Sequence, residues 1–554
     1  KNQTDWALAL GINRFVFHTF AHKPHGDNLM PGMTMGPYGV HWDRGQTWWP
    51  MVGAYHSYLS RCQFILMQGK PVADILFLLP EGAPNVFVPL ASALEGTDTM
   101  PDKKSYSFDA CSPSYLINNA SAVENKIIFP SGASYRILIL PEIDEMTPEL
   151  AEKIDFLLKN GASVAGIRPI KSPSLSGYPA CDNKLNQITQ IVWGIDWKQE
   201  RSRIKSINGT FFKLYKDRDE KASGGKSNEK MFDFYPPYDT IISFLKKLNV
   251  KPDFVSSGNI RYHHRTLPDR DIYFISNRTG EKITDTCRFR DGTSHAELWN
   301  PLTAEIKKSL SVTISEEGAA LPVVLEPYGS YFVVFYKDKK DKKDKKDKED
   351  KEEQAVKLET GNDFPEKDEV MDINGPWKVT FDPARGGPAG EVVFDSLYDW
   401  TESGDSGMKY YSGIAEYRCT FSFPEGSFNK KKNHYFLNTG KVNNIARIKV
   451  NGREAGVLWT DPWELEITSF LKKKDNLLEI EVANLWINRL IGDEQEPWDG
   501  IEDGQWPAWL ENGSPRPTNR ITFTTHRFWK KDDPLVPSGL TGPVKIAKLP
   551  VKTK

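Results

Sequence analysis

The stretch NRFVFHTFAH, residues 13–22, decides the fold expected for the start of this chain. Aromatic Phe15 and Phe17 would lie on one side of an extended backbone, with Val16 and His18 on the other. This alternation of aromatic and β-branched residues predicts a β-strand.

The segment that follows, residues 23–50, is rich in glycine and proline, a composition that no regular element tolerates. A long loop that carries aromatic and charged residues at the end of a strand is more often a site than a spacer. The strand end and the loop supply the candidate site residues His18, His22, Trp42, Asp43, Arg44, Trp48 and Trp49.

An amphipathic helix is predicted over residues 52–68, because Val52, Leu59 and Leu66 recur on one face and Gly69 ends the pattern. Strand, loop and helix form one βα unit, and such units place ligands at the carboxyl end of the strand. Residues 4–11 are typical of the end of a preceding helix. The chain is therefore expected to begin within a repeating α/β structure.

The composition narrows the classes of partner. A net charge of -2 gives the chain no overall positive potential that would attract nucleic acid or an anionic membrane surface. No apolar run is long enough to span a bilayer. The five cysteines show neither a disulfide framework nor metal-ligand spacing. The 16 tryptophans are the informative excess, since sugar sites use aromatic faces, although cores absorb such residues too.

A parallel α/β domain is predicted over residues 71–250. Its apolar runs suit strands buried on both faces, and one helix opens with Thr147 as N-cap and Pro148 at the first position. Strand, helix and strand with short connections are typical of a parallel sheet. The predicted strands cover residues 72–79, 135–140 and 163–167, the helices 147–158 and 238–248, and a flexible loop 221–230.

This middle domain resembles the class I glutamine-amidotransferase or flavodoxin-like fold. An amidotransferase needs a nucleophilic cysteine on a tight turn between strand and helix. Cys111 follows no apolar strand, and no glycine-rich phosphate loop opens a helix. The domain is therefore predicted to be structural.

Residues 251–336 are predicted to form a small β-sandwich. His263 and His264 are adjacent, and because adjacent strand residues face opposite sides, one metal ion is not expected to bind both. The predicted strands are residues 260–264, 271–276, 287–289, 295–299, 310–314, 320–325 and 330–336.

Residues 337–368 are predicted to be a charged linker, because a low-complexity run of lysine, aspartate and glutamate cannot bury enough apolar area to become ordered. Residues 369–554 are β-rich and are predicted to form a jelly-roll β-sandwich, with a hairpin turn at Asn451 and Gly452. The tryptophans between Trp459 and Trp509 suit either a carbohydrate-facing rim or a large aromatic core.

Long strings in both halves of the chain resemble glycoside hydrolase family 106, the α-L-rhamnosidases. The strings are residues 10–24 (LGINRFVFHTFAHKP), 31–39 (PGMTMGPYG), 43–44, 47–50, 58–64, 71–74, 411–413, 459–463, 484–495 (NLWINRLIGDEQ) and 537–540. The C-terminal part also resembles the sugar-binding jelly roll of glycoside hydrolase family 2.

The resemblance implies a catalytic (β/α)8 barrel, of which residues 1–70 would be the last βα portion, followed by accessory β domains. It also implies an inverting mechanism with two carboxylates and an active-site calcium ion. The implied partner is an oligosaccharide or polysaccharide, and the implied location is periplasmic or secreted in a bacterium.

The family's catalytic Glu pair is expected upstream of the predicted strand, yet no Glu occurs before Glu81. The pair is therefore expected upstream of Lys1, and no catalytic residue is assigned. We expect His18 and His22 to hydrogen-bond sugar hydroxyls or to orient a carboxylate, with a purely structural role as the alternative.

The other candidates each have two interpretations. Asp43 and Arg44 either bind sugar hydroxyls or hold the loop together as an ion pair. Trp42, Trp48 and Trp49 are candidate sugar platforms, and at least one of them is expected to belong to the core.

The sequence thus predicts the C-terminal portion of an α-L-rhamnosidase-like glycosidase that removes terminal rhamnose from plant or bacterial polysaccharide. Two alternatives stay open. One is a carbohydrate-binding or structural assembly, and the other is a β-galactosidase-like hydrolase with the same order of domains. The linkage cleaved and the oligomeric state are not determined by the sequence.

Overall fold

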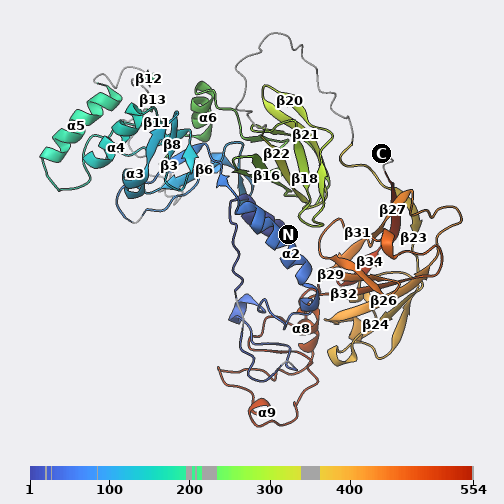
Figure 1. Cartoon of the computed structure of the whole chain (residues 1–554). Helices are drawn as coiled ribbons and strands as arrows, with labels where there is room; N and C mark the ends of the chain where they lie inside the picture. The colour runs from blue at the N-terminus through green and yellow to red at the C-terminus, as the bar shows by residue number, and fades with distance from the viewer. Residues whose placement is uncertain are drawn as a thin grey trace. The chain divides into compact units, whose positions relative to one another are not determined.

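A computed structural model describes the chain except for residues 19, 20, 27, 84, 195–202, 206–208, 215–233, 338–361 and 552–554 (Figure 1). The chain divides into two compact units, each built from two separate segments. Unit 1 comprises Lys1–Asn13 and Phe64–Asp363, and unit 2 comprises Arg14–Gln63 and Phe364–Lys554. The loop predicted at 221–230 and most of the linker predicted at 337–368 lie outside the described residues.

Unit 1 contains the predicted parallel sheet, with strand order β12-β13-β11-β10-β3-β6. All neighbouring strands are parallel except β12, which runs antiparallel to β13. The strands are β3 (Ile75–Leu78), β6 (Phe108–Cys111), β10 (Ile137–Ile139), β11 (Ser163–Gly166), β12 (Arg203–Lys205) and β13 (Thr210–Lys213).

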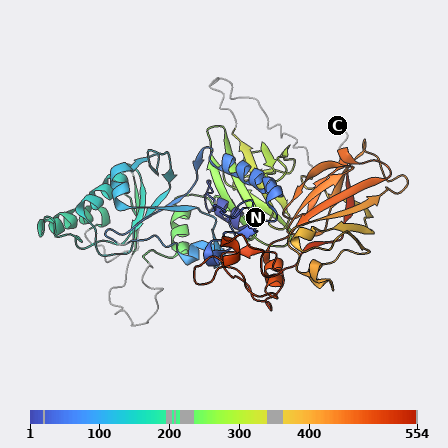
Figure 2. The same ribbon diagram turned by 90° about the horizontal axis from the view of Figure 1, so that it is seen from below.

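Helices cover both faces of this sheet because alternate strand residues point to opposite sides. Leu76 and Leu138 pack in one core cluster with residues of α3, α4 and α5, whereas Ile75 and Ile137 pack in another with residues of α6. Figures 1 and 2 show α4 and α5 on one side of the sheet and α6 on the other. The helices are α3 (Pro113–Asn119), α4 (Pro148–Lys159), α5 (Ala180–Trp193) and α6 (Tyr238–Lys247).

Two antiparallel sheets follow in unit 1, with orders β14-β17-β21-β20 and β19-β18-β22-β16-β15-β2. The strands are β2 (Lys70–Pro71), β14 (Phe254–Val255), β15 (Ile260–Thr266), β16 (Arg270–Asn277), β17 (Ile283–Phe289), β18 (Ala296–Trp299), β19 (Ile306–Lys308), β20 (Thr313–Ser315), β21 (Gly318–Leu325) and β22 (Ser330–Tyr336). The helix expected over residues 4–11 is present as α1 (Asn2–Ala9), and the Ser276 hydroxyl on β16 donates to its Asp5 carboxylate at 3.0 Å.

The C-terminal part of unit 2 is also antiparallel, with sheet orders β23-β35-β27-β31 and β25-β24-β26-β32-β29-β30. The strands are β23 (Asp368–Asp372), β24 (Trp377–Thr380), β25 (Glu391–Phe394), β26 (Ile414–Phe421), β27 (Asn433–Asn438), β29 (Ile445–Val450), β30 (Arg453–Leu458), β31 (Glu464–Glu466), β32 (Asn476–Ala483) and β35 (Lys545–Pro550).

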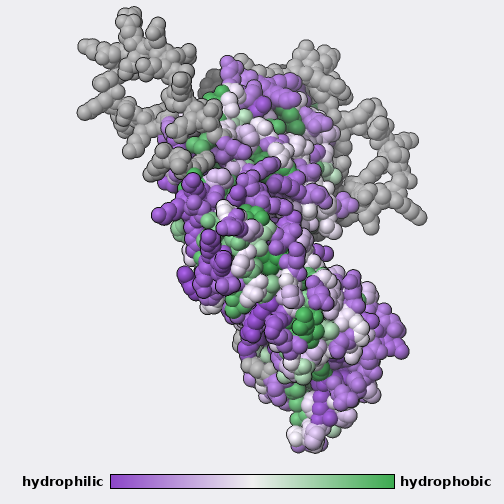
Figure 3. All heavy atoms as spheres, turned by 90° about the vertical axis from the view of Figure 1, so that its right-hand side faces the viewer, coloured by the Kyte–Doolittle hydropathy of each residue, from purple (hydrophilic) through white to green (hydrophobic). Residues whose placement is uncertain are grey.

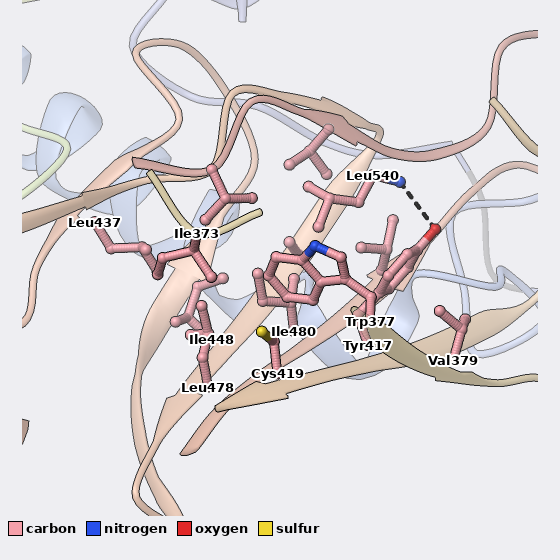
Figure 4. Close-up of a cluster of buried hydrophobic side chains, with 14 of the residues drawn as sticks. Ile373, Trp377, Val379, Tyr417, Cys419, Leu437, Ile448, Leu478, Ile480 and Leu540 are labelled. Atoms are coloured by element: carbon pink, nitrogen blue, oxygen red, sulfur yellow. Dashed lines mark hydrogen bonds between the residues drawn. The ribbon is translucent and has the colours of Figure 1, made fainter. Parts of the chain in front are cut away.

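A single core of apolar side chains lies within this sandwich (Figure 4). Trp377 on β24 and Tyr417 on β26 are fully buried in it. The Tyr417 hydroxyl oxygen accepts hydrogen bonds from the Trp400 indole at 2.6 Å and from the Leu540 backbone at 3.2 Å. The core therefore satisfies its polar atoms internally, as buried polar groups require.

The strand predicted over residues 13–22 is wrong for the part of that segment that the structure describes, since none of those residues lies in a strand. Side chains, and not a neighbouring strand, contact it. The backbone N–H of Phe15 donates to the Gln63 side chain at 2.9 Å, and the Phe17 ring stacks on Trp42. The barrel that this strand was expected to close therefore stays a prediction.

The helix expected after the loop is confirmed as α2 (Gly53–Leu66). In the described part of the chain, no helix combines the length and the hydropathy that crossing a membrane requires. Figure 3 agrees for the face it shows, where apolar residues form small groups separated by hydrophilic ones.

Candidate functional site

Aromatic rings from four parts of unit 2 gather into one group, here called the aromatic cluster. The Phe17 ring stacks on the Trp42 indole, with centroids 4.7 Å apart and planes 13° apart. The ring centroid of Trp48 also lies 4.7 Å from that of Trp42. The cluster is extended by rings of the loop, of α2 and of the residue after β30. Its members are Phe17, Trp42, Trp48, Trp49, Tyr55, His56 and Trp459.

A hydrogen bond orders the centre of the aromatic cluster. The Trp42 indole N–H donates to Nε2 of His56 at 3.0 Å. Burial lowers the pKa of His56 from its usual value, which favours the neutral ring that this bond requires. His56 was not among the candidate residues, because one histidine on an amphipathic helix is usually structural.

The three candidate tryptophans are not equivalent. Trp48 packs with Trp459 against the buried Met51, Ile445 and Ala483, so it belongs in part to the core. Trp42 and Trp49 are half-buried and lie in the aromatic cluster. Their remaining exposed surface is the part that a sugar ring could contact.

Asp43 is a buried anchor of the loop, with 2% of its surface exposed. Its Oδ1 accepts from the Gly45 backbone N–H at 2.7 Å and lies 3.4 Å from the Lys23 ammonium. Gly45 is required there, because a Cβ at this position would meet the ammonium and the Pro31 carbonyl. The ion pair expected with Arg44 is thus made by Lys23, and the Arg44 side chain is exposed.

Two polar atoms of this loop are buried without a hydrogen-bond partner among the described residues. They are Oδ2 of Asp43 and Nδ1 of His41. His18 and His22, by contrast, are exposed, and the cluster reaches this segment only through Phe17. The structure therefore brings the tryptophans and Asp43 into one loop without placing either histidine in a defined contact.

The loop is held by residues near the other end of the chain. Strand β1 (Pro31–Gly32) pairs in parallel with β33 (Phe523–Thr524), and the Thr34 N–H donates to the Thr525 hydroxyl at 3.0 Å. The buried Trp486 donates its indole N–H to the Gly45 carbonyl at 2.7 Å. Trp486 is therefore a structural tryptophan of the core and does not belong to a carbohydrate-facing rim.

Three carboxylates of the segment 493–499, those of Asp493, Glu494 and Asp499, are bound by cations, hydroxyls or backbone N–H groups. Asp493 Oδ2 accepts from the Thr522 N–H and hydroxyl, both at 2.6 Å, and Glu494 pairs with Arg520 at 2.5 Å. Burial would raise the pKa of Asp499, but hydrogen bonds from Arg516 and Thr518 hold it below its usual value. These groups are committed to structure and do not form a free acid and base.

The one close group of potential ligands found among the described His, Cys, Asp and Glu side chains does not fit the calcium ion that the family resemblance implies. Calcium takes six to eight oxygen ligands. Among described side chains, one group of three potential ligands lies close together, namely Asp253, His264 and Asp291. A histidine nitrogen is a poor ligand for calcium, and Arg290 already occupies this site with its guanidinium 3.3 Å from Asp253.

Cys111 is not an activated nucleophile. It ends β6, a strand that the sequence did not reveal because its residues FDAC are only partly apolar. It lines a cavity of about 370 Å³ with Tyr115, Phe129 and Tyr135. Burial raises the pKa of its thiol to about 12, whereas a nucleophilic cysteine needs a lowered pKa.

Comparisons with known proteins identify the class and then the family. The architecture matches a rhamnosidase from Novosphingobium sp. PP1Y with a TM-score of 0.78 and 27% identity, over 99% of this chain and 46% of that one. Residues 1–313 match the sequence profile of the alpha-L-rhamnosidase family. By family, the protein is a glycoside hydrolase. The chain belongs to the alpha-L-rhamnosidase family, glycoside hydrolase family 106.

A second relative carries a different activity in its name. A protein of Formosa agariphila, provisionally named beta-glucuronidase, is 25% identical over an alignment that covers 100% of this chain and 62% of that protein. The chain thus spans less than two thirds of the length of both relatives. A beta-glucuronidase from Ruminococcus gnavus, with a TM-score of 0.18 over 21% of this chain, is too dissimilar to support an argument.

Proposed function

We propose that this chain forms the sugar-contacting part of a glycosidase that removes terminal α-L-rhamnose from polysaccharide. The observation that carries the proposal is the aromatic cluster, all of whose members except Trp459 lie within the segment matched by the family profile. Rhamnose presents a methyl group and C–H bonds on its ring faces, and half-buried indoles such as Trp42 and Trp49 suit such surfaces.

The proposed reaction is hydrolysis with inversion at the anomeric carbon. A carboxylic acid would protonate the leaving oxygen while a carboxylate activates water on the opposite face, the two being about 6.5–9.5 Å apart. Asp43 is buried beside Lys23, and Asp493 and Glu494 are held by hydrogen bonds and ion pairs. We infer that the reacting pair belongs to sequence outside these 554 residues.

In this proposal His18 binds a sugar hydroxyl or orients a catalytic carboxylate. It is exposed and directly follows Phe17, whose stacking on Trp42 fixes the backbone beside it. His22 and Arg44, both exposed, are assigned the same class of contact with hydroxyls. The calcium ion remains a prediction of the resemblance, and no step here depends on it.

Titration calorimetry of the chain with rhamnose oligosaccharides tests the binding. Trp49→Ala is expected to weaken binding by roughly 5- to 150-fold, because stacking of a ring on one aromatic side chain is worth about 1–3 kcal/mol. Trp299→Ala is the matched control, since that half-buried indole lies in unit 1 and donates to Glu297. Equal affinities of both variants and the parent chain would count against the proposal.

The name of the Formosa relative supports a second candidate, hydrolysis of β-glucuronides. Nitrophenyl α-L-rhamnoside and nitrophenyl β-glucuronide separate the two when each is offered to the chain. Binding of the rhamnoside without turnover is the expected result. If the 554 residues turn over either substrate, they contain the reacting carboxylates, and the inference that this pair lies outside them is refuted. If they prefer the glucuronide, β-glucuronides replace α-L-rhamnosides as the proposed substrate class.

A further inference from the structure

Unit 1 contains a row of side chains that alternate in charge, most of them buried and the last of them, Lys337, 36% exposed. Asp74, directly before β3, accepts two hydrogen bonds from Nη1 of Arg290, at 2.9 and 3.1 Å. The other side of that guanidinium lies 3.3 Å from Asp253. Asp253 in turn contacts His264 on β15 at 2.9 Å.

The row continues beyond the imidazole. Nε2 of His264 lies 3.3 Å from Asp271 on β16, and the other oxygen of Asp271 lies 3.2 Å from the Lys337 ammonium. Six groups therefore follow in the order acid, base, acid, base, acid, base. We call them the charge row: Asp74, Arg290, Asp253, His264, Asp271 and Lys337.

The geometry identifies the protonation state of His264. A neutral imidazole has one N–H donor, yet both ring nitrogens of His264 face carboxylate oxygens, which only accept. Both contacts are hydrogen bonds only if the ring carries two protons and a positive charge. The ring is fully buried and stacks on Tyr273 with centroids 3.9 Å apart, so water does not replace a lost partner.

The charge row joins two layers of unit 1. Asp74 precedes β3, the strand next to the β6 edge of the parallel sheet, and its backbone carbonyl accepts from the Arg136 N–H at 2.8 Å. Arg290 follows β17, and Asp253 precedes β14, both in the antiparallel part. Removing one charge from the row leaves its neighbours buried without compensation, which is strongly unfavourable.

We propose that the charge row is a pH-dependent lock, in which protonated His264 holds the antiparallel strands to the parallel sheet and loss of its proton loosens them. On deprotonation the proton leaves to solvent, one of the two hydrogen bonds is lost, and Asp253 and Asp271 lose the cation between them. Other groups facing the row are Asp291, whose carboxylate lies 3.4 Å from Arg290, and Tyr273, which donates to Asp253 at 3.1 Å. The neighbouring His263 lies on the same strand, with its side chain on the opposite side.

The expected pH range follows from His264. Burial lowers its pKa, but Asp253 and Asp271 raise it, to a net value of about 9 against an ordinary 6.5. A group with a raised folded pKa contributes its full stabilisation below the unfolded pKa and loses it as the pH rises through the folded pKa. The lock is therefore closed below pH 6.5 and opens as the pH rises through about 9.

Hydrogen exchange of the full chain between pH 6 and pH 10, corrected for the intrinsic exchange rate, tests the proposal. The opening constant of peptides covering β14, β15 and β3 is expected to rise on the order of 100-fold in the parent chain. His264→Gln should remove most of this pH dependence. His263→Gln is the matched control, because desolvation lowers the pKa of this adjacent histidine to about 3, so it carries no charge in this range.

Carbon-13 NMR of labelled histidine supplies a second readout. The His264 resonance, assigned by its loss in His264→Gln, should titrate near pH 9, and Asp271→Asn should move that titration towards its ordinary value. This variant serves if His264→Gln does not fold. A His264 titration near 6.5 in the parent chain, or equal pH dependence of exchange in His264→Gln and the parent chain, overturns the proposal.

Discussion

The indole of Trp42 donates its N–H to Nε2 of His56 across 3.0 Å, and this one bond ties the predicted sugar-binding loop to helix α2. Phe17 stacks on the same indole, so the segment before the loop is ordered through the same pair. The acceptor nitrogen keeps its lone pair only while His56 is neutral.

Lowering the pH should therefore break this bond. Because burial lowers the pKa of His56, its stabilisation is complete above the ordinary value of 6.5 and is lost as the pH falls below it. Tryptophan fluorescence is expected to change with a midpoint below 6.5, and His56→Phe should abolish the change. His434→Phe, at an exposed position beside Glu466, is the control. A midpoint above 6.5 would show that the bond does not favour the neutral ring.

Asp43→Ala should destabilise the loop that Asp43 anchors. It removes the acceptor of the Gly45 N–H and leaves the buried Lys23 ammonium without its partner, at an expected cost of about 2–4 kcal/mol in the free energy of unfolding. Urea unfolding measures this value. Arg44→Ala, at the neighbouring exposed position, should cost no more than about 1 kcal/mol. Similar costs for the two variants would mean that Asp43 is not an anchor.

Glu81 should stabilise the start of α4. Its two oxygens accept from the Thr147 N–H at 2.7 Å and from the Thr147 hydroxyl at 2.6 Å, and that hydroxyl in turn accepts from the Leu150 N–H. Glu81→Ala is expected to lower stability by about 1–2 kcal/mol, measured by thermal unfolding. Glu149→Gln, in the exposed first turn, should cost about 0.3–1 kcal/mol through the helix dipole alone. An equal effect of both changes would contradict the capping role.

Tyr417→Phe isolates the polar contribution to the core of unit 2. The change conserves the ring but leaves the Trp400 indole and the Leu540 N–H buried without an acceptor. Each unsatisfied donor costs about 1–3 kcal/mol, so we expect a loss of roughly 2–4 kcal/mol in urea unfolding. Tyr398→Phe, at a half-buried position, should change the stability by less than about 1 kcal/mol. A neutral Tyr417→Phe would show that the core satisfies these donors in another way.

The regular elements of unit 1 were largely predictable because their signals are local. Thr147 and Pro148 identified the start of α4, and the apolar runs identified β3, β10 and β11. Strand β6 was missed because its register on β3 depends on a neighbouring strand and not on its own residues. A strand defined by its partner leaves little trace in its own sequence.

The first stretch of the sequence shows that β propensity alone does not produce a strand. Phe15, Val16 and Phe17 have the β propensity of a strand, but propensity describes how residues fit a sheet and does not supply one. In the structure the Phe17 ring stacks on Trp42, and Val16 is 95% exposed. The alternation therefore wrongly predicted a paired strand in the described part of this segment.

The site was predictable only in part. The density of aromatic and charged residues identified the loop, and Trp42, Trp48 and Asp43 do lie close to one another within it. His56, Lys23 and Trp486 were missed because their roles depend on contacts between distant segments. Whether His18 and His22 bind a sugar stays a prediction.

The parallel pairing of Pro31 with Phe523 has a consequence for how this protein is made. Residues 14–63 leave the ribosome before residues 64–363 of unit 1, yet the strands and anchors that complete their unit are translated only after those residues. The aromatic loop therefore lacks its final partners while some three hundred residues of another unit are translated and fold. Its exposed rings are a hazard for aggregation during that interval, and chaperone demand should fall once Phe523 has been synthesised.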